Sequence, residues 1–202
     1  MKLTFIGVEG IPMVEPGDDL VALIDEALAA SGEQLLADDV IVIAQKIISK
    51  AEDRYLDLRS VTPTEEAIRL GEEVDKDPRK VQAILDESNE IVRQRPGVLI
   101  VEQRSGFVQA NAGIDQSNIR LGDGDPDDLC LLLPIDSDAS AQRLHTTIRE
   151  RHNLEVGIII NDSLGRAWRM GTLGLAIGVA GFTALEDYIG GHDIFGRELL
   201  VT

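Results

Sequence analysis

Short apolar segments alternate with amphipathic helical segments along most of this chain. The segments with strand character are Leu3–Val8, Val40–Ala44, Val98–Glu102, Phe107–Ala110, Gly157–Ile160 and Glu198–Val201. This alternation is typical of mixed α/β or α+β proteins, in which helices cover the faces of a sheet. A chain of 202 residues is long enough for one domain with a substantial core, or for two lobes that share one. We therefore predict one α/β (mixed α+β) domain over residues 1–202, with two intimately packed lobes as the alternative.

Capping signals predict where three of the helices begin. The first helix starts at an Asp18 or Asp19 cap, before apolar residues that recur at helical spacing. The segment Thr62-Pro63-Thr64-Glu65 matches a capping box with proline at the first helical position. Asp77-Pro78 repeats the arrangement before an apolar periodicity that runs to Val92. We expect the last two helices to form a hairpin packed over a sheet.

The charge balance limits the partners of this chain. Its 36 acidic and 19 basic residues give a net charge of −17, which argues against binding to nucleic acid or to an anionic membrane. No segment approaches the about 20 apolar residues of a membrane span, and the N-terminus lacks signal-peptide features, so we expect a cytoplasmic protein. The single cysteine, Cys130, lies in an apolar run and is expected to pack as a small hydrophobic residue.

Two segments each deliver a carboxylate where a sharp change of backbone is expected. Asp115 lies in Asn111–Asn118, and Asp162 follows the apolar strand Gly157–Ile160. Carboxylates in such places can hold a hard divalent cation, and Asn118 adds an amide that can contact a base, a ribose or a metal-bound water. Alone, Asn111–Asn118 is only a turn with an aspartate. Together with Asp162 and the lysines below, it suggests a site for a metal and a nucleotide.

Two lysines follow the apolar strand Val40–Ala44. Lys46 and Lys50 come with the uncharged polar residues Gln45 and Ser49 at the end of a buried strand, where ligands gather in open α/β sheets. Lysine there can pair with phosphate oxygens as a point charge. The alternative is that the two lysines, four positions apart, decorate an exposed helix face. Spacing alone does not decide between the two.

Two arginines lie close behind Asp162. Arg166 and Arg169 flank the lone tryptophan Trp168 and could clamp a phosphate or carboxylate beside the metal. A surface arginine pair around a core tryptophan is the alternative. The sequence contains no phosphate loop of the G-x-x-x-x-G-K-[ST] type, no H-E-x-x-H zinc helix and no G-x-S-x-G elbow, so common nucleotide folds are disfavoured.

Seven blocks, in order, give the chain a resemblance to the coenzyme F-420 gamma-glutamyl ligases. The blocks are Val8–Pro12, Gln45–Glu52, Ala110–Asn118, Leu132–Pro134, Asp162–Arg169, Ala176–Gly178 and Gly196–Leu199. The resemblance implies a gamma-glutamyl-ligase-type fold with mixed sheets and flanking helices. It also implies a GTP-dependent ligase of coenzyme F-420 biosynthesis, which joins L-glutamate to the lactyl carboxylate of a deazaflavin precursor through an acyl phosphate. Further glutamates are then added through gamma linkages.

The resemblance also implies roles for individual residues. Asp115, Asp162 and Ser163 would hold two divalent cations, Mg²⁺ or Mn²⁺, and a monovalent cation such as K⁺ is allowed. The GTP site would be lined by Glu9, Gly10, Ile11, Pro12, Gln45, Lys46, Lys50 and Asn118. Asp115, Asp162 and Lys50 are the expected catalytic residues. Contact of Arg166 or Arg169 with an anionic substrate group is our inference and no family assignment. A homodimer is implied by the resemblance alone.

The chain departs from the family pattern in two places. Asp162-Ser163 stands where the family usually has Asp-Thr, a change that keeps the hydroxyl. The family normally continues beyond the position of Thr202 with a helix, a strand and a glutamine that completes the site, so a C-terminally truncated chain would leave the second metal one ligand short. Two alternatives stay open: a shortened, non-catalytic relative that binds nucleotide or deazaflavin, and an amide-forming ligase acting on a different carboxylate.

Overall fold

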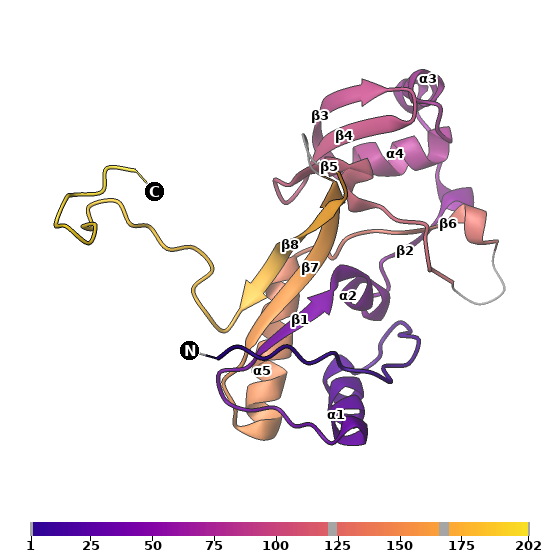
Figure 1. Cartoon of the computed structure of the whole chain (residues 1–202). Helices are drawn as coiled ribbons and strands as arrows, with labels where there is room; N and C mark the ends of the chain where they lie inside the picture. The colour runs from indigo at the N-terminus through magenta and orange to yellow at the C-terminus, as the bar shows by residue number, and fades with distance from the viewer. Residues whose placement is uncertain (1, 121–124, 166–169, 202) are drawn as a thin grey trace.

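The computed structural model describes residues 2–120, 125–165 and 170–201 (Figure 1). Within these ranges it has three sheets and five α-helices, which confirms the predicted mixed α/β class. The helices are α1 (Leu20–Ser31), α2 (Gln45–Ala51), α3 (Glu65–Val74), α4 (Pro78–Asp86) and α5 (Ser137–His152). The strands are β1 (Val40–Ala44), β2 (Tyr55–Asp57), β3 (Ser88–Arg95), β4 (Val98–Gln103), β5 (Val108–Ala110), β6 (Leu129–Leu131), β7 (Gly157–Gly165) and β8 (Thr172–Ala180). Short 3₁₀ helices lie at η1 (Leu58–Ser60), η2 (Asn111–Gly113) and η3 (Pro126–Asp128).

The sheet β1-β7-β8 organises one part of the molecule. β1 runs parallel to β7, and β8 runs antiparallel to β7 along its whole length. Ile158 and Ile160 of β7 are fully buried in a core that α1 and α5 complete with Val21 and Ile148. Figure 1 shows β7 and β8 as a long two-stranded ribbon with α5 beside it. None of the helices described is long and apolar enough to cross a bilayer.

A second apolar cluster lies around the antiparallel sheet β3-β4-β5. Leu99 and Val101 of β4 are fully buried against Val81 and Ile84 of α4. α3 and α4 pack against each other and both contact β3, as Figure 1 shows, so the predicted helical hairpin over a sheet is confirmed. Burial raises the pKa of the Cys130 thiol in this cluster to about 11, and Cys130 packs there as the predicted small hydrophobic residue.

The capping signals were right for two helices and displaced for the third. Asp19 caps α1 by accepting from the backbone N–H of Ala22, and Asp77 caps α4 with Pro78 at its start. The expected cap at Thr62 was wrong, because Thr64 accepts from the N–H of Ala67 and α3 begins only at Glu65.

The helix expected to reach Val92 ends at Asp86 instead. Residues 88–95 form β3, which pairs with β4. Isoleucine and valine at positions 91 and 92 suit a strand as well as a helix, and the pairing with β4 decides the outcome.

Two predicted strands are absent from the described residues, and four observed strands, β2, β3, β6 and β8, were not predicted. Leu3–Val8 has no regular secondary structure and pairs with no described strand, and Glu198 makes a single bridge to His192. An apolar alternation becomes a strand only when a partner edge lies beside it. β8 was missed because Gly174 and Gly178 lower its strand propensity. Its glycines instead allow neighbouring groups to approach closely, since a Cβ at Gly174 would lie 2.5 Å from Asn161 Oδ1.

Candidate active site

The parallel pairing of β1 and β7 brings distant residues to one edge of the sheet. Ala44, the last residue of β1, lies opposite Asn161 of β7. α2 therefore begins at Gln45 just where β7 reaches Asp162. This is the carboxyl edge of a parallel pair, where ligands bind in open α/β sheets.

Lys46 joins α2 to the loop that follows η2. Its Nζ lies 2.7 Å from Asp115 Oδ2 and donates to the backbone oxygen and the Oγ of Ser117, each at 2.9 Å. Asp115 Oδ1 accepts the N–H of Ser117 at 2.7 Å. Sequence reasoning did not single out Ser117, although an aspartate two positions before a serine is a known Asx-turn signal that could have found it.

Lys50 lies one turn further along α2 and reaches the same loop. Its side chain is buried, and Nζ donates to the backbone oxygen of Asn118 at 3.1 Å. Burial, together with the charge of Lys46, lowers the pKa of Lys50. Gln45 is also buried and donates to Ser49 Oγ at 2.7 Å. The alternative in which the lysines only decorate a solvated helix face is therefore wrong.

Asp162 lies inside β7 rather than after it. The strand continues to Gly165 with Asp162 opposite Leu175 of β8, so the expected sharp change of backbone at Asp162 was wrong. The irregularity lies earlier, as a register shift between Ile160 and Asn161. Such a bulge changes the direction in which the following side chains point.

The surroundings of the two carboxylates shift their pKa values in opposite directions. Burial raises the pKa of Asp162, and the charge of Asp115 adds to this, while the N–H of Ser163 and the charge of Lys46 act the other way. Burial also acts to raise the pKa of Asp115, but hydrogen bonds from Lys46 and Ser117 outweigh it and hold that pKa below its ordinary value. The described contacts therefore stabilise the charged form of Asp115 better than that of Asp162.

The donor atoms at this edge suit a hard divalent cation. Asp115, Asp162 and the hydroxyl of Ser163 offer oxygen, which Mg²⁺ and Mn²⁺ prefer. The raised pKa of Asp162 is the sign of a carboxylate that a cation would stabilise. Within the described ranges no three His, Cys, Asp or Glu side chains form a ready metal cluster. Hydroxyl, backbone, water or substrate oxygens would have to complete the coordination.

The backbone around Asp115 adopts conformations that L-residues seldom take. Asn111, Ala112 and Asn118 have φ values of 54°, 54° and 56°. Two buried polar atoms beside them, Gln109 Nε2 and Asn111 Oδ1, have no hydrogen-bond partner in the part of the chain that the structure describes. Strained backbone and unsatisfied polar atoms concentrate at ligand sites, which supports a functional role for this loop.

The remaining predicted site residues are not joined to this cluster by the described contacts. Ile11 packs against the main core, whereas Glu9, Gly10 and Pro12 are exposed. None of the described hydrogen bonds or ion pairs connects Glu9 to Lys46 or Asp115. Arg166 and Arg169, with Trp168 between them, lie outside the described residues.

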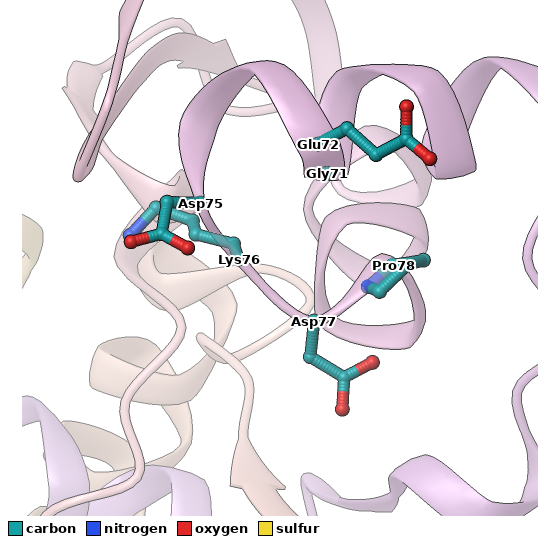
Figure 2. A pocket seen from close by; sticks show the side chains of 6 residues that line it. All are labelled: Gly71, Glu72, Asp75, Lys76, Asp77 and Pro78. Atoms are coloured by element: carbon teal, nitrogen blue, oxygen red, sulfur yellow. The ribbon is translucent and has the colours of Figure 1, made fainter.

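A shallow hollow of about 340 Å³ lies elsewhere, at the turn between α3 and α4. It is lined by Gly71, Glu72, Asp75, Lys76, Asp77 and Pro78, none of which was a predicted site residue. Figure 2 shows the carboxylates of Glu72, Asp75 and Asp77 pointing in different directions. Such divergent groups do not form a binding constellation, so we place the site at the carboxyl edge of β1 and β7.

Fold and geometry together define an α/β protein with paired lysines and carboxylates at the edge of a parallel strand pair. Residues 10–202 match the F420-0:Gamma-glutamyl ligase family. The chain is 45% identical over 202 residues to the Coenzyme F420:L-glutamate ligase of Methanothermobacter thermautotrophicus, an alignment that covers 100% of this chain and 78% of that protein. The proteins of the same name from Methanopyrus kandleri and Archaeoglobus fulgidus are 41% and 40% identical, over 99% and 100% of this chain and 76% of each relative. The chain belongs to the F420-0:Gamma-glutamyl ligase family.

Proposed function

We propose that this protein is a GTP-dependent ligase that adds L-glutamate to the coenzyme F420 precursor. The names of the relatives support ligation of glutamate in the biosynthesis of coenzyme F420. GTP as the energy source, formation of GDP and the acyl-phosphate route are the further steps of the proposal. The observation on which it rests is the cluster of Lys46, Lys50 and Asp115 beside Asp162 at one sheet edge.

The proposed chemistry follows from the weakness of a carboxylate as an electrophile. The lactyl carboxylate oxygen attacks the γ-phosphorus of GTP, the bond between the β,γ-bridging oxygen and the γ-phosphorus breaks, and GDP leaves. The amine of glutamate then attacks the acyl carbon, phosphate departs with the bonding pair, and the amine proton passes to solvent. Lys46 and Lys50 would pair with phosphate oxygens, and Arg166 or Arg169 would contact an anionic substrate group.

Asp115, Asp162 and Ser163 would hold two divalent cations, Mg²⁺ or Mn²⁺. When bound, such cations neutralise charge on the transferring phosphoryl group. A monovalent cation such as K⁺ remains a further candidate. Glu9, Gly10, Ile11 and Pro12 are proposed to contact GTP together with Gln45 and Asn118, which needs the exposed N-terminal segment to close over the site.

The proposal includes a homodimer in the cytoplasm. Large apolar side chains are exposed on the N- and C-terminal segments, among them Phe5 and Phe195. Apolar surface of this kind marks protein contacts. GTP and free glutamate are cytoplasmic metabolites, which is the reason for the proposed location.

Mass spectrometry of the deazaflavin tests the function directly. After incubation with GTP, L-glutamate and Mn²⁺, we expect a product heavier by one glutamyl unit, formed together with GDP. Asp115→Ala and Asp162→Ala should each lower the rate by at least about a hundredfold, because metal ligation supplies several kcal/mol of transition-state stabilisation. Circular dichroism should show both variants folded.

Glu72→Ala is the matched control, because it removes an exposed carboxylate from the hollow of Figure 2 and should leave the rate unchanged. Tight GTP binding without product would favour the non-catalytic alternative. A different carboxylate acceptor used in preference to the deazaflavin would favour the other ligase. Wild-type rates in both aspartate variants would contradict the assigned site.

A further inference from the structure

Lys46 contacts Asp115 Oδ2, and the other carboxylate oxygen, Oδ1, accepts the N–H of Ser117, so both oxygens that Asp115 could offer a divalent cation already have partners. The Lys46 ammonium contacts three oxygens, namely Asp115 Oδ2 at 2.7 Å and the backbone oxygen and Oγ of Ser117 at 2.9 Å. Resting on the proposed function, we propose that Lys46 is an internal counter-cation that competes with the divalent cation for Asp115. Nucleotide phosphates would draw Lys46 away and so open the site to metal.

The contacts of Lys46 resemble those of a bound cation. An ammonium is a compact point charge, and here it faces only oxygen acceptors from one short loop. Asp115 is stabilised by this partner, whereas burial raises the pKa of Asp162 and its described hydrogen bond comes from the N–H of Ser163. Lys46 would therefore have to leave Asp115 Oδ2 before that oxygen could ligate a divalent cation.

The two lysines of α2 have different roles in this proposal. Lys50 is buried and holds the backbone oxygen of Asn118, so it can anchor the loop while Lys46 moves. Lys46 is about one third exposed and has a flexible stem that ends at the carboxyl edge of the sheet. A phosphate bound at this edge offers Lys46 a stronger anionic partner than Asp115. Nucleotide and metal would then bind cooperatively, and the coupling must be reciprocal.

Mn²⁺ affinity measured with and without a non-hydrolysable GTP analogue tests this exchange. Lys46→Gln keeps a donor for Ser117 but removes the charge. Without nucleotide, we expect the variant to bind Mn²⁺ about two- to fivefold more tightly than the wild type, the size of a partly exposed ion pair. With saturating analogue the difference should largely disappear, because Lys46 of the wild type then contacts phosphate and no longer competes for Asp115.

Lys80→Gln controls for the change in overall charge. Lys80 donates to Gln116 Oε1 of the same loop at 2.6 Å, so this variant loses the same charge without releasing a carboxylate. Its Mn²⁺ affinity should match the wild type in both conditions. Ser117→Ala removes one acceptor of Lys46 and keeps all charges. It should raise the affinity for Mn²⁺ alone about twofold, so the proposal stays testable if Lys46→Gln does not fold.

The outcomes separate this proposal from the function on which it rests. A wild type that binds no Mn²⁺, or an Asp115→Asn variant that binds it normally, would overturn the proposed metal site. If Asp115→Asn loses Mn²⁺ but Lys46→Gln binds it no better than wild type without nucleotide, the competition is wrong. If Lys46→Gln binds Mn²⁺ more weakly than the wild type by the same factor with and without the analogue, Lys46 only supports the loop.

Discussion

Asp115 and Asp162 carry the same carboxyl group, yet their surroundings move their pKa values in opposite directions. The sequence predicted that the two carboxylates belong to one site, because each follows an apolar segment and has polar neighbours. It could not predict which one would have a cation as partner, since that depends on where α2 points Lys46. Ser117 contacts both Lys46 and Asp115, and the Asx-turn signal that links it to Asp115 was present in the sequence but was overlooked.

Cys130 gives a residue-level prediction for the pH dependence of stability. Burial raises the pKa of its thiol to about 11 from an ordinary value near 9. Between these pH values the unfolded chain loses the proton while the folded chain keeps it, so the folded state binds more protons and stability falls as pH rises. Urea unfolding should show this fall for the wild type.

Cys130→Ala supplies the comparison, because other groups also titrate at high pH. The variant should be less stable at pH 8 by about 1–2 kcal/mol, owing to the lost buried sulfur. The difference from wild type should shrink between about pH 9 and 11. A constant difference over this range would show that the thiol titrates normally and is not enclosed.

The elements that the sequence predicted best are those with local signals. α1 and α4 begin at their predicted aspartate caps, because a cap and its helix lie within a few residues of each other. Strands depend on a partner that is distant in the chain. Leu3–Val8 has the composition of a strand but no partner strand among the described residues, whereas the glycine-rich β8 pairs with β7 from Ile158 to Gly165.

Gly178 gives the prediction for this element. A Cβ at Gly178 would lie 2.3 Å from the backbone oxygen of Ser137 and 2.5 Å from its carbonyl carbon, where α5 begins. Backbone atoms at a helix start cannot move cheaply, so Gly178→Ala should lower the free energy of unfolding by about 1–3 kcal/mol. Urea denaturation measures this change.

Gly165→Ala is the matched control at the end of the paired strand β7. No atom of the described residues lies within 4 Å of a Cβ built at Gly165, and the change in stability should stay within about 0.5 kcal/mol. If Gly178→Ala were as stable as Gly165→Ala, the close packing of β8 on α5 would be wrong.

At the scale of the molecule, the candidate site joins the two apolar clusters. Lys46 lies on α2, whose Ile48 belongs to the cluster of the β1-β7-β8 sheet. Asp115 follows Ile114, which belongs to the cluster around β3 and β4. The ion pair between Lys46 and Asp115 therefore links both parts. Sequence patterns predicted the residues on each side but not the contact between Lys46 and Asp115, because that contact depends on how the two clusters pack.

The exposed C-terminal segment gives a prediction about assembly. Figure 1 shows it extending away from the body after β8, and its Ile194 and Phe195 are 92% and 88% exposed. Apolar side chains held this far from any core gain stability by packing against another chain, so we expect a homodimer in sedimentation velocity experiments.

Replacing both Ile194 and Phe195 with serine should raise the dissociation constant of the dimer at least about tenfold, since two buried apolar anchors contribute more than about 1.4 kcal/mol. Ile135→Ser, at a residue 79% exposed before α5, should leave the constant unchanged. A monomeric wild type, or equal weakening by both changes, would exclude this segment as the dimer contact.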